Sequence, residues 1–134
     1  MVVEGCVPVS MSHFLANKIH DHVLRNTAYT PPAVVYLAPF EVIHTAAGTG
    51  GIEVAGGSYA RQAITFAAPS AGVCANSLAA QFDAMPACTI TGSALYDAAT
   101  VGNMLHYAPF AAPMVVEAGT DLPITVGDIV AVLH

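Results

Sequence analysis

The sequence predicts a mainly β fold, a single-domain β-sandwich or barrel-like domain that carries one amphipathic helix near its N-terminus. The chain has 134 residues, which is the length of one domain with one hydrophobic core. Seven or eight short apolar segments follow one another along it, separated by Gly, Pro, Asn and Asp. Such spacing is typical of sandwiches and barrels. Helical periodicity occurs in one segment only.

The chain divides into an extended N-terminal arm, residues 1–10, and a β-rich domain with the helix, residues 11–134. Four valines give the arm strand propensity, while a glycine and a proline interrupt it. These valines are Val2, Val3, Val7 and Val9. An arm of this kind either lies over its own domain or adds a strand to a neighbour.

The helix is predicted to begin after Ser12, whose hydroxyl can cap its N-terminus, and to end near Arg25 or Asn26. Leu15, Ile19 and Val23 recur four residues apart and form an apolar stripe. The helix is expected to pack on one edge of the β domain or to sit outside it.

Pro31 and Pro32 force an extended entry into the first strand, residues 33–37. Apolar or alternating segments bounded by turn residues predict the later strands. These cover residues 52–54, 59–66, 73–82, 89–96, 104–110, 114–116, 122–126 and 129–133.

Arg61 is one of only three basic residues in the chain. In the strand 59–66 it shares a face with Tyr59, because side chains two residues apart point the same way. We expect it to pair with an acid such as Glu53 across a hairpin, or with a neighbouring subunit.

The composition indicates which classes of partner the protein can bind. Charged residues make up 9% and hydrophobic residues 55%, which suggests a surface largely covered by partners, unless alanine and glycine merely inflate the count. The net charge of −6 argues against nucleic acid and against an anionic membrane surface. Cys6, Cys74 and Cys88 are odd in number and widely spaced, which favours free thiols and synthesis in a reducing cytoplasm.

No stretch carries the pattern of an active site, and we expect neither an enzyme nor a cofactor. His20 and His22 are the most metal-like pair, but side chains two apart on a helix diverge, so no metal site is expected. A Gly-x-Ser-x-Gly elbow is absent from the sequence. Two minor alternatives stay open. One is a small envelope hydrolase that uses Glu53 or Asp83, and the other is a glycan-binding module with Tyr59, Tyr96 and Tyr107 as stacking platforms.

Several segments together resemble a family of small virion proteins of tailed bacteriophages, and the similarity runs from about Met11 to the C-terminus. Residues 51–62, Gly-Ile-Glu-Val-Ala-Gly-Gly-Ser-Tyr-Ala-Arg-Gln, are the most specific part of it. The other matching segments are 17–27, 31–38, 95–99, 102–105 and 127–129. The chain departs from the family in lacking a tryptophan before the 95–97 segment and in carrying Pro39 after the first strand.

Members of this family are often labelled tail-fibre proteins, and β-rich phage proteins of this size also serve as capsid decoration proteins. The resemblance therefore implies a structural component of the virion. We expect a capsid decoration, or cement, protein that binds the major capsid protein and copies of itself as a homo-oligomer. The alternative is a tail-tip, tail-fibre or adaptor protein. The expected assembly interface consists of Val2, Val3, Val7, Val9 and Arg61.

Overall fold

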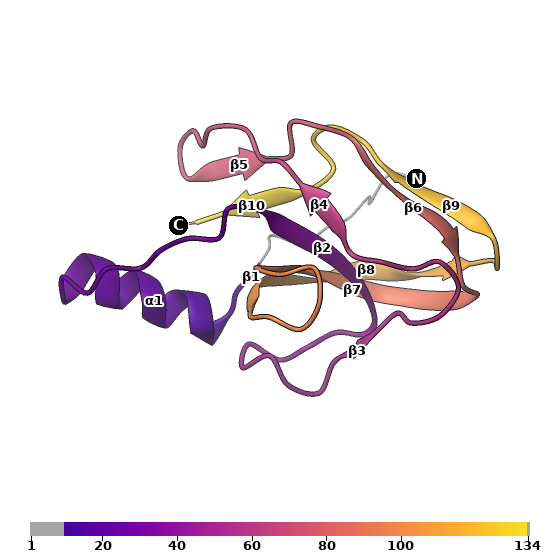
Figure 1. Ribbon diagram of the computed structural model, residues 1–134, viewed down its shortest axis with the longest axis horizontal. Helices are drawn as coiled ribbons and strands as arrows, with labels where there is room; N and C mark the ends of the chain where they lie inside the picture. Colours follow the sequence, from indigo (N-terminus) through magenta and orange to yellow (C-terminus); the bar gives the residue numbers. More distant parts are fainter. Residues whose placement is uncertain (1–9, 134) are drawn as a thin grey trace.

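The computed structural model describes residues 10–133. They form packed β layers, with one helix that projects at one end of the long axis (Figure 1). The prediction of a mainly β fold with one N-terminal helix is confirmed. The sheets do not close on themselves, so of the two predicted forms the sandwich is the right one.

One layer is a six-stranded antiparallel sheet with the order β1-β8-β7-β2-β3, in which β4 also pairs with β2. Its strands are β1 (Ser10–Met11), β2 (Val35–Val42), β3 (Ile52–Glu53), β4 (Gln62–Ile64), β7 (Cys88–Tyr96) and β8 (Met104–Val116). The other layer holds two strand pairs. These are β5 (Val73–Ala75) with β10 (Val130–Val132), and β6 (Ala80–Met85) with β9 (Thr120–Ile124).

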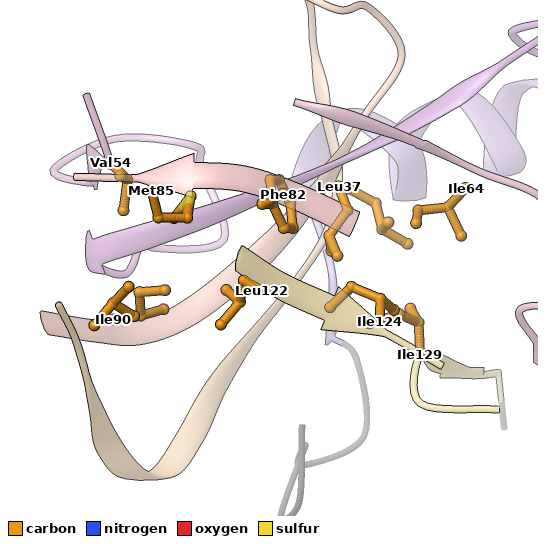
Figure 2. Packing of buried hydrophobic residues seen from close by; sticks show 11 residues of the cluster. Leu37, Val54, Ile64, Phe82, Met85, Ile90, Leu122, Ile124 and Ile129 are labelled. Carbon is orange, nitrogen blue, oxygen red and sulfur yellow. The ribbon is translucent and has the colours of Figure 1, made fainter. Parts of the chain in front are cut away.

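The main core lies between the layers, where side chains from strands far apart in the sequence point toward one another (Figure 2). Its buried members are Leu37, Val54, Ile64, Phe82, Met85, Ile90, Leu95, Val116, Leu122, Ile124 and Ile129. The centre of the large sheet is buried on its other face as well, because Ala38, Phe40, Ala94, Tyr96 and Met104 form a second cluster there. Strands with two buried faces read as continuous apolar runs, as β7 does in its second half.

Strand β2 continues through Pro39 to Val42, so the predicted end at residue 37 is wrong. Proline lacks a backbone N–H and is normally confined to sheet edges. On its outer side β2 pairs with β4 as far as Leu37 and with β3 from Phe40 onward. The Pro39 carbonyl accepts from Val54 N on that same side at 3.1 Å, so the proline nitrogen faces the junction between β4 and β3. No ladder hydrogen bond is lost there.

The predicted strand 73–82 is wrong as a single element, because the chain leaves β5 at Asn76 and re-enters a strand at Ala80. Asn76 is 2% exposed and bonds to several backbone groups at once. Its amide nitrogen donates to the carbonyls of Leu78 and Thr125, at 3.1 and 2.9 Å, and its Oδ1 accepts from Ile129 N at 2.9 Å. A single side chain thus joins the break after β5 to the segments around β9 and β10.

The two predicted strands 104–110 and 114–116 form one strand, β8, with a bulge between them. Ile90 pairs with Met114 and Gly92 with Pro109, so two steps along β7 match five along β8. The bulge accommodates Pro113, which has no N–H to donate to the ladder.

The helix α1 (His13–Leu24) has Ser12 as its N-cap and Arg25 as its C-cap, as predicted. Ser12 is buried and fixes the helix start to β8, since its N–H donates to Leu105 O at 2.9 Å and its Oγ donates to Met104 O at 2.6 Å. Asn26 adopts a φ of 53°, the left-handed conformation that often follows a helix. No residue of α1 is buried, and Val23 is 70% exposed.

Substitution of Ser12 by alanine is expected to lower the free energy of unfolding by about 2 kcal/mol. It removes the bond to Leu15 N at the helix N-terminus and leaves the Met104 carbonyl unpaired in a buried position. Urea denaturation followed by circular dichroism measures the loss. Thr45→Ala serves as the control, because the Thr45 hydroxyl bonds only to Thr49 at an exposed site. An equal loss in both variants would contradict the role of Ser12.

Candidate functional site

The most elaborate polar arrangement of the described residues is centred on Arg61, beside the outer face of the large sheet. The guanidinium meets the Glu53 carboxylate in a bidentate pair, with Nε to Oε1 at 2.9 Å and Nη2 to Oε2 at 2.8 Å. The Arg61 side chain is 7% exposed. The predicted Arg61–Glu53 pair is therefore present. The hairpin predicted to hold it is wrong, because β3 and β4 both pair with β2 and not with each other. The predicted strand 59–66 is also too long, since Arg61 precedes β4 (Gln62–Ile64).

Arg61 also holds the loop between β7 and β8. Its Nη1 donates to the carbonyls of Ala98 and Val101, at 3.0 and 2.8 Å. Its Cζ lies 3.8 Å from the centroid of the Tyr96 ring, which is a cation–π contact. Four N–H bonds of the guanidinium are thus used within the fold, and one N–H on Nη2 remains.

The same loop is closed by Asp97, whose carboxylate accepts from Asn103 N at 2.7 Å and from Asn103 Nδ2 at 2.9 Å. Gly102 has a φ of +72°, and a Cβ there would lie 2.5 Å from Asp97 Oδ1. Val101, at the loop tip, has a φ of 55° and is 84% exposed. A β-branched residue in this conformation is strained, so the bond from Arg61 holds the loop in a shape it would not favour alone.

Tyr59 completes the cluster from the loop before β4. Its hydroxyl donates to Glu53 Oε1 at 2.6 Å, and its ring stacks on Phe82 with centroids 6.0 Å apart. Burial acts to raise the pKa of the Glu53 carboxyl, but the bonds from Arg61 and Tyr59 outweigh it and hold that pKa below its ordinary value. Burial and the bond to Glu53 raise the pKa of Tyr59. Both groups therefore keep one protonation state near neutral pH.

His44 lies next to this cluster, with its ring centroid 4.3 Å from that of Phe40 and its Nε2 3.3 Å from the Tyr96 hydroxyl. Gly51 backs the ring so closely that a Cβ there would lie 2.6 Å from it. The Nδ1 atom is buried and has no hydrogen-bond partner among residues 10–133. Burial lowers the pKa of His44, with Glu53 opposing and Arg61 reinforcing the shift. The imidazole is therefore held neutral.

A groove of about 430 Å³ runs beside the cluster, between the segment 53–61 and the loop 99–101. The polar groups that border it are already bonded to one another, and the Glu53 carboxylate accepts three hydrogen bonds. Such groups position backbone and have little capacity left to activate a substrate. The arrangement acts as a clamp between two loops.

The other predicted site residues are placed as follows. Val2, Val3, Val7 and Val9 lie outside the described residues, so their part of the interface stays a prediction, as does contact of Arg61 with a neighbouring subunit. Asp83 is exposed on β6 and bonds to Gln81. Tyr96 lies buried under Arg61, and Tyr107 packs against the second cluster. Sequence reasoning missed His44 and the two loop carbonyls, because only the fold brings them to the cluster.

The remaining chemistry of the described residues is limited. No three His, Cys, Asp or Glu side chains within residues 10–133 gather where they could hold a metal ion. Cys74 and Cys88 are free and half-buried, and burial raises the pKa of the Cys88 thiol. The one helix in this part of the chain is too short and too polar to cross a membrane.

Acidification is expected to destabilise the fold in two stages. The pKa values of His44 and His106 are lowered chiefly by burial, so the unfolded chain binds more protons as the pH falls below about 6.5, and stability drops. The pKa of Glu53 is also lowered, so its contribution is full above its unfolded value and is lost as the pH falls through the folded one.

Urea midpoints at pH 7.5, 6.0 and 5.0 test this expectation. The variant His44→Phe keeps the aromatic contacts and should reduce the first stage to the part contributed by His106, whereas His20→Gln on the exposed side of α1 should leave it unchanged. Stability that is constant between pH 7.5 and 5.0 would show the histidines to be unimportant.

A search of curated proteins found no match to this chain. A family model described as podophage GP4 fiber I protein gp80 matches residues 10–131, which includes the helix and all the described strands except the last residue of β10. The segments 51–62, 95–99 and 102–105, which contribute to the resemblance to small phage virion proteins, lie within this match. The chain therefore belongs to the podophage GP4 fiber I protein family and is a phage virion structural protein.

Proposed function

We propose that the protein is a non-enzymatic subunit of a podophage tail fibre, or of the adaptor that attaches the fibre to the tail. The observation that carries the proposal is the family match over residues 10–131, because the family description names a fibre. The geometry of the Arg61 cluster supports this proposal, since its polar groups bond to one another and to loop carbonyls. The function is mechanical, and the fold supplies a rigid block for contacts with other virion proteins.

Capsid decoration, the first expectation from the sequence, is the second candidate. Low charge and exposed apolar side chains favour a subunit that is covered by partners. Both features suit a fibre subunit and a cement protein equally. The family description names only the fibre, so we place the fibre first.

Stoichiometry in purified particles separates the two candidates. Quantitative mass spectrometry against the major capsid protein is expected to give a low copy number set by the tail's rotational symmetry. Immunogold labelling is expected at the tail and not over the head. A copy number on the order of hundreds, matching the capsid lattice, would favour the decoration protein instead.

A further inference from the structure

Positive charge in the described part of the chain is concentrated on the projecting helix. Arg61 forms an ion pair with Glu53. The other two basic residues, Lys18 and Arg25, belong to α1 and its C-cap. The β domain by contrast carries acids that make no ion pair among residues 10–133. These are Glu41, Asp83, Asp97, Glu117, Asp121 and Asp128. The helix also carries Asp21, which pairs with Arg25, so Lys18 is its one uncompensated basic side chain. The molecule is therefore electrically asymmetric, with a weakly basic helix on an acidic body.

The same end of the helix exposes apolar side chains. Val23 and Leu24, in its last turn, are 70% and 72% exposed, and Arg25 follows them with a side chain that is 74% exposed. The helix start is fixed by Ser12 and by the bond from His13 N to Ala46 O at 2.9 Å. The last turn thus projects from an anchored base, with two exposed apolar side chains beside Arg25. The Arg25 guanidinium donates one N–H to Asp21 at 2.8 Å, and its other N–H groups are open to a partner.

A surface of opposite character lies at the other end of the long axis, near the turn from β8 to β9 (Figure 1). Val115 is 73% exposed there and stands between two grooves, of about 290 and 520 Å³. Glu117 borders both grooves, Asp121 borders the first and Glu41 the second. We call this the Val115 surface. It offers apolar contact with a rim of carboxylates.

We propose that the last turn of α1 in one copy docks on the Val115 surface of a second copy, which joins the two head to tail. Val23 and Leu24 would cover Val115, so apolar surface meets apolar surface. The N–H groups of Arg25 that do not bind Asp21 would face Glu117 or Asp121. The two surfaces lie at opposite ends of one molecule, so the helix does not reach its own Val115 surface.

In the head-to-tail arrangement the contact is heterologous, and it continues from copy to copy unless the rotation closes a ring. A linear or cyclic array follows, in which each copy uses its helix once and its Val115 surface once. A reciprocal pair, in which each helix lies on the other copy's Val115 surface, would instead stop at two copies, and a wild type that stops at two copies would contradict the array. The inference rests on the proposed fibre role only in taking a second copy as the partner. It is tested in solution, whereas the fibre role is tested by copy number on the particle, so either can fail alone.

Sedimentation equilibrium of the full chain over a concentration series tests the proposal. The double variant Val23→Gln/Leu24→Gln and the variant Val115→Gln should each weaken association about tenfold or more, the loss expected for a buried apolar side chain. The control Leu78→Gln alters a residue that is 60% exposed elsewhere and should associate like the wild type. None of these changes alters the charge.

Mixing the two variants with impaired association is the decisive experiment. The Val23→Gln/Leu24→Gln protein keeps its Val115 surface and the Val115→Gln protein keeps its helix, so together they should form a one-to-one complex that does not grow further. An interface between identical patches gives no such rescue. A monomeric wild type at every concentration, or a mixture without the one-to-one complex, would overturn the proposal.

Exchanging the charges of Arg25 and Glu117 tests the role of the carboxylates that border the Val115 surface. Arg25→Glu should weaken association, and adding Glu117→Arg in the same chain should restore it, because the altered charges again face each other in the array. Circular dichroism of each variant confirms that the fold is kept. Restoration shows that the two charges meet, and failure of Glu117→Arg and of Asp121→Arg to restore association would contradict the proposed docking.

Discussion

Replacing Arg61 with alanine is expected to lower the free energy of unfolding by about 3 kcal/mol, because removal of one partner leaves a largely buried charge uncompensated. The change strands the Glu53 carboxylate and frees the carbonyls of Ala98 and Val101. It also removes the cation from the Tyr96 ring. Chemical denaturation monitored by tyrosine fluorescence and by circular dichroism measures the loss.

The chain offers a matched control in its other Arg–carboxylate pair. Arg25 and Asp21 are 2.8 Å apart, but the Arg25 side chain is 74% exposed, so Arg25→Ala should cost less than about 0.5 kcal/mol. Arg61→Lys keeps the charge and loses the bidentate geometry, and its loss should fall between these two. If Arg61→Ala and Arg25→Ala are equally mild, Arg61 is not a clamp.

Replacing Asn76 with alanine should also cost about 3 kcal/mol, because three buried or half-buried backbone groups lose their partner at once. Asn76→Asp keeps the acceptor for Ile129 N but loses the two donors, so it should be destabilised as well. Thermal and urea unfolding at neutral pH measure both changes.

Ser77→Ala is the neighbouring control for Asn76. The Ser77 hydroxyl makes one long bond, 3.4 Å to Thr65 O at an exposed site, so its loss should change stability by less than about 0.5 kcal/mol. A small effect of Asn76→Ala would mean that water replaces the amide and that the bonds to residues 125 and 129 contribute little.

Features fixed by neighbouring residues could be predicted from the sequence. The helix limits follow from a capping serine and an asparagine exit, and β7 follows from an apolar segment between turns. The Arg61–Glu53 pair was predictable because basic residues are so scarce that a partly apolar strand would hold one only with a partner.

Features that depend on distant segments could not be predicted from the sequence. Whether Pro39 ends a strand depends on where β3 and β4 meet along β2, and no local pattern records that. Asn76 resembles an ordinary turn residue until Thr125 and Ile129 surround it. The loop half of the clamp consists of main-chain carbonyls, which every sequence offers and which only the fold brings to Arg61.

The bonds of Asn76 also have a consequence for synthesis. β5 pairs with β10, and the Asn76 side chain bonds to Thr125 and Ile129, which lie about fifty positions later in the chain. While the ribosome is still translating those residues, β5 has an open edge and the Asn76 amide is solvated. The smaller layer therefore closes late, and long-range closure of this kind is slow. Until the last strands emerge, the nascent chain shows an apolar edge to other nascent subunits, and that interval is its period of greatest risk of misassembly.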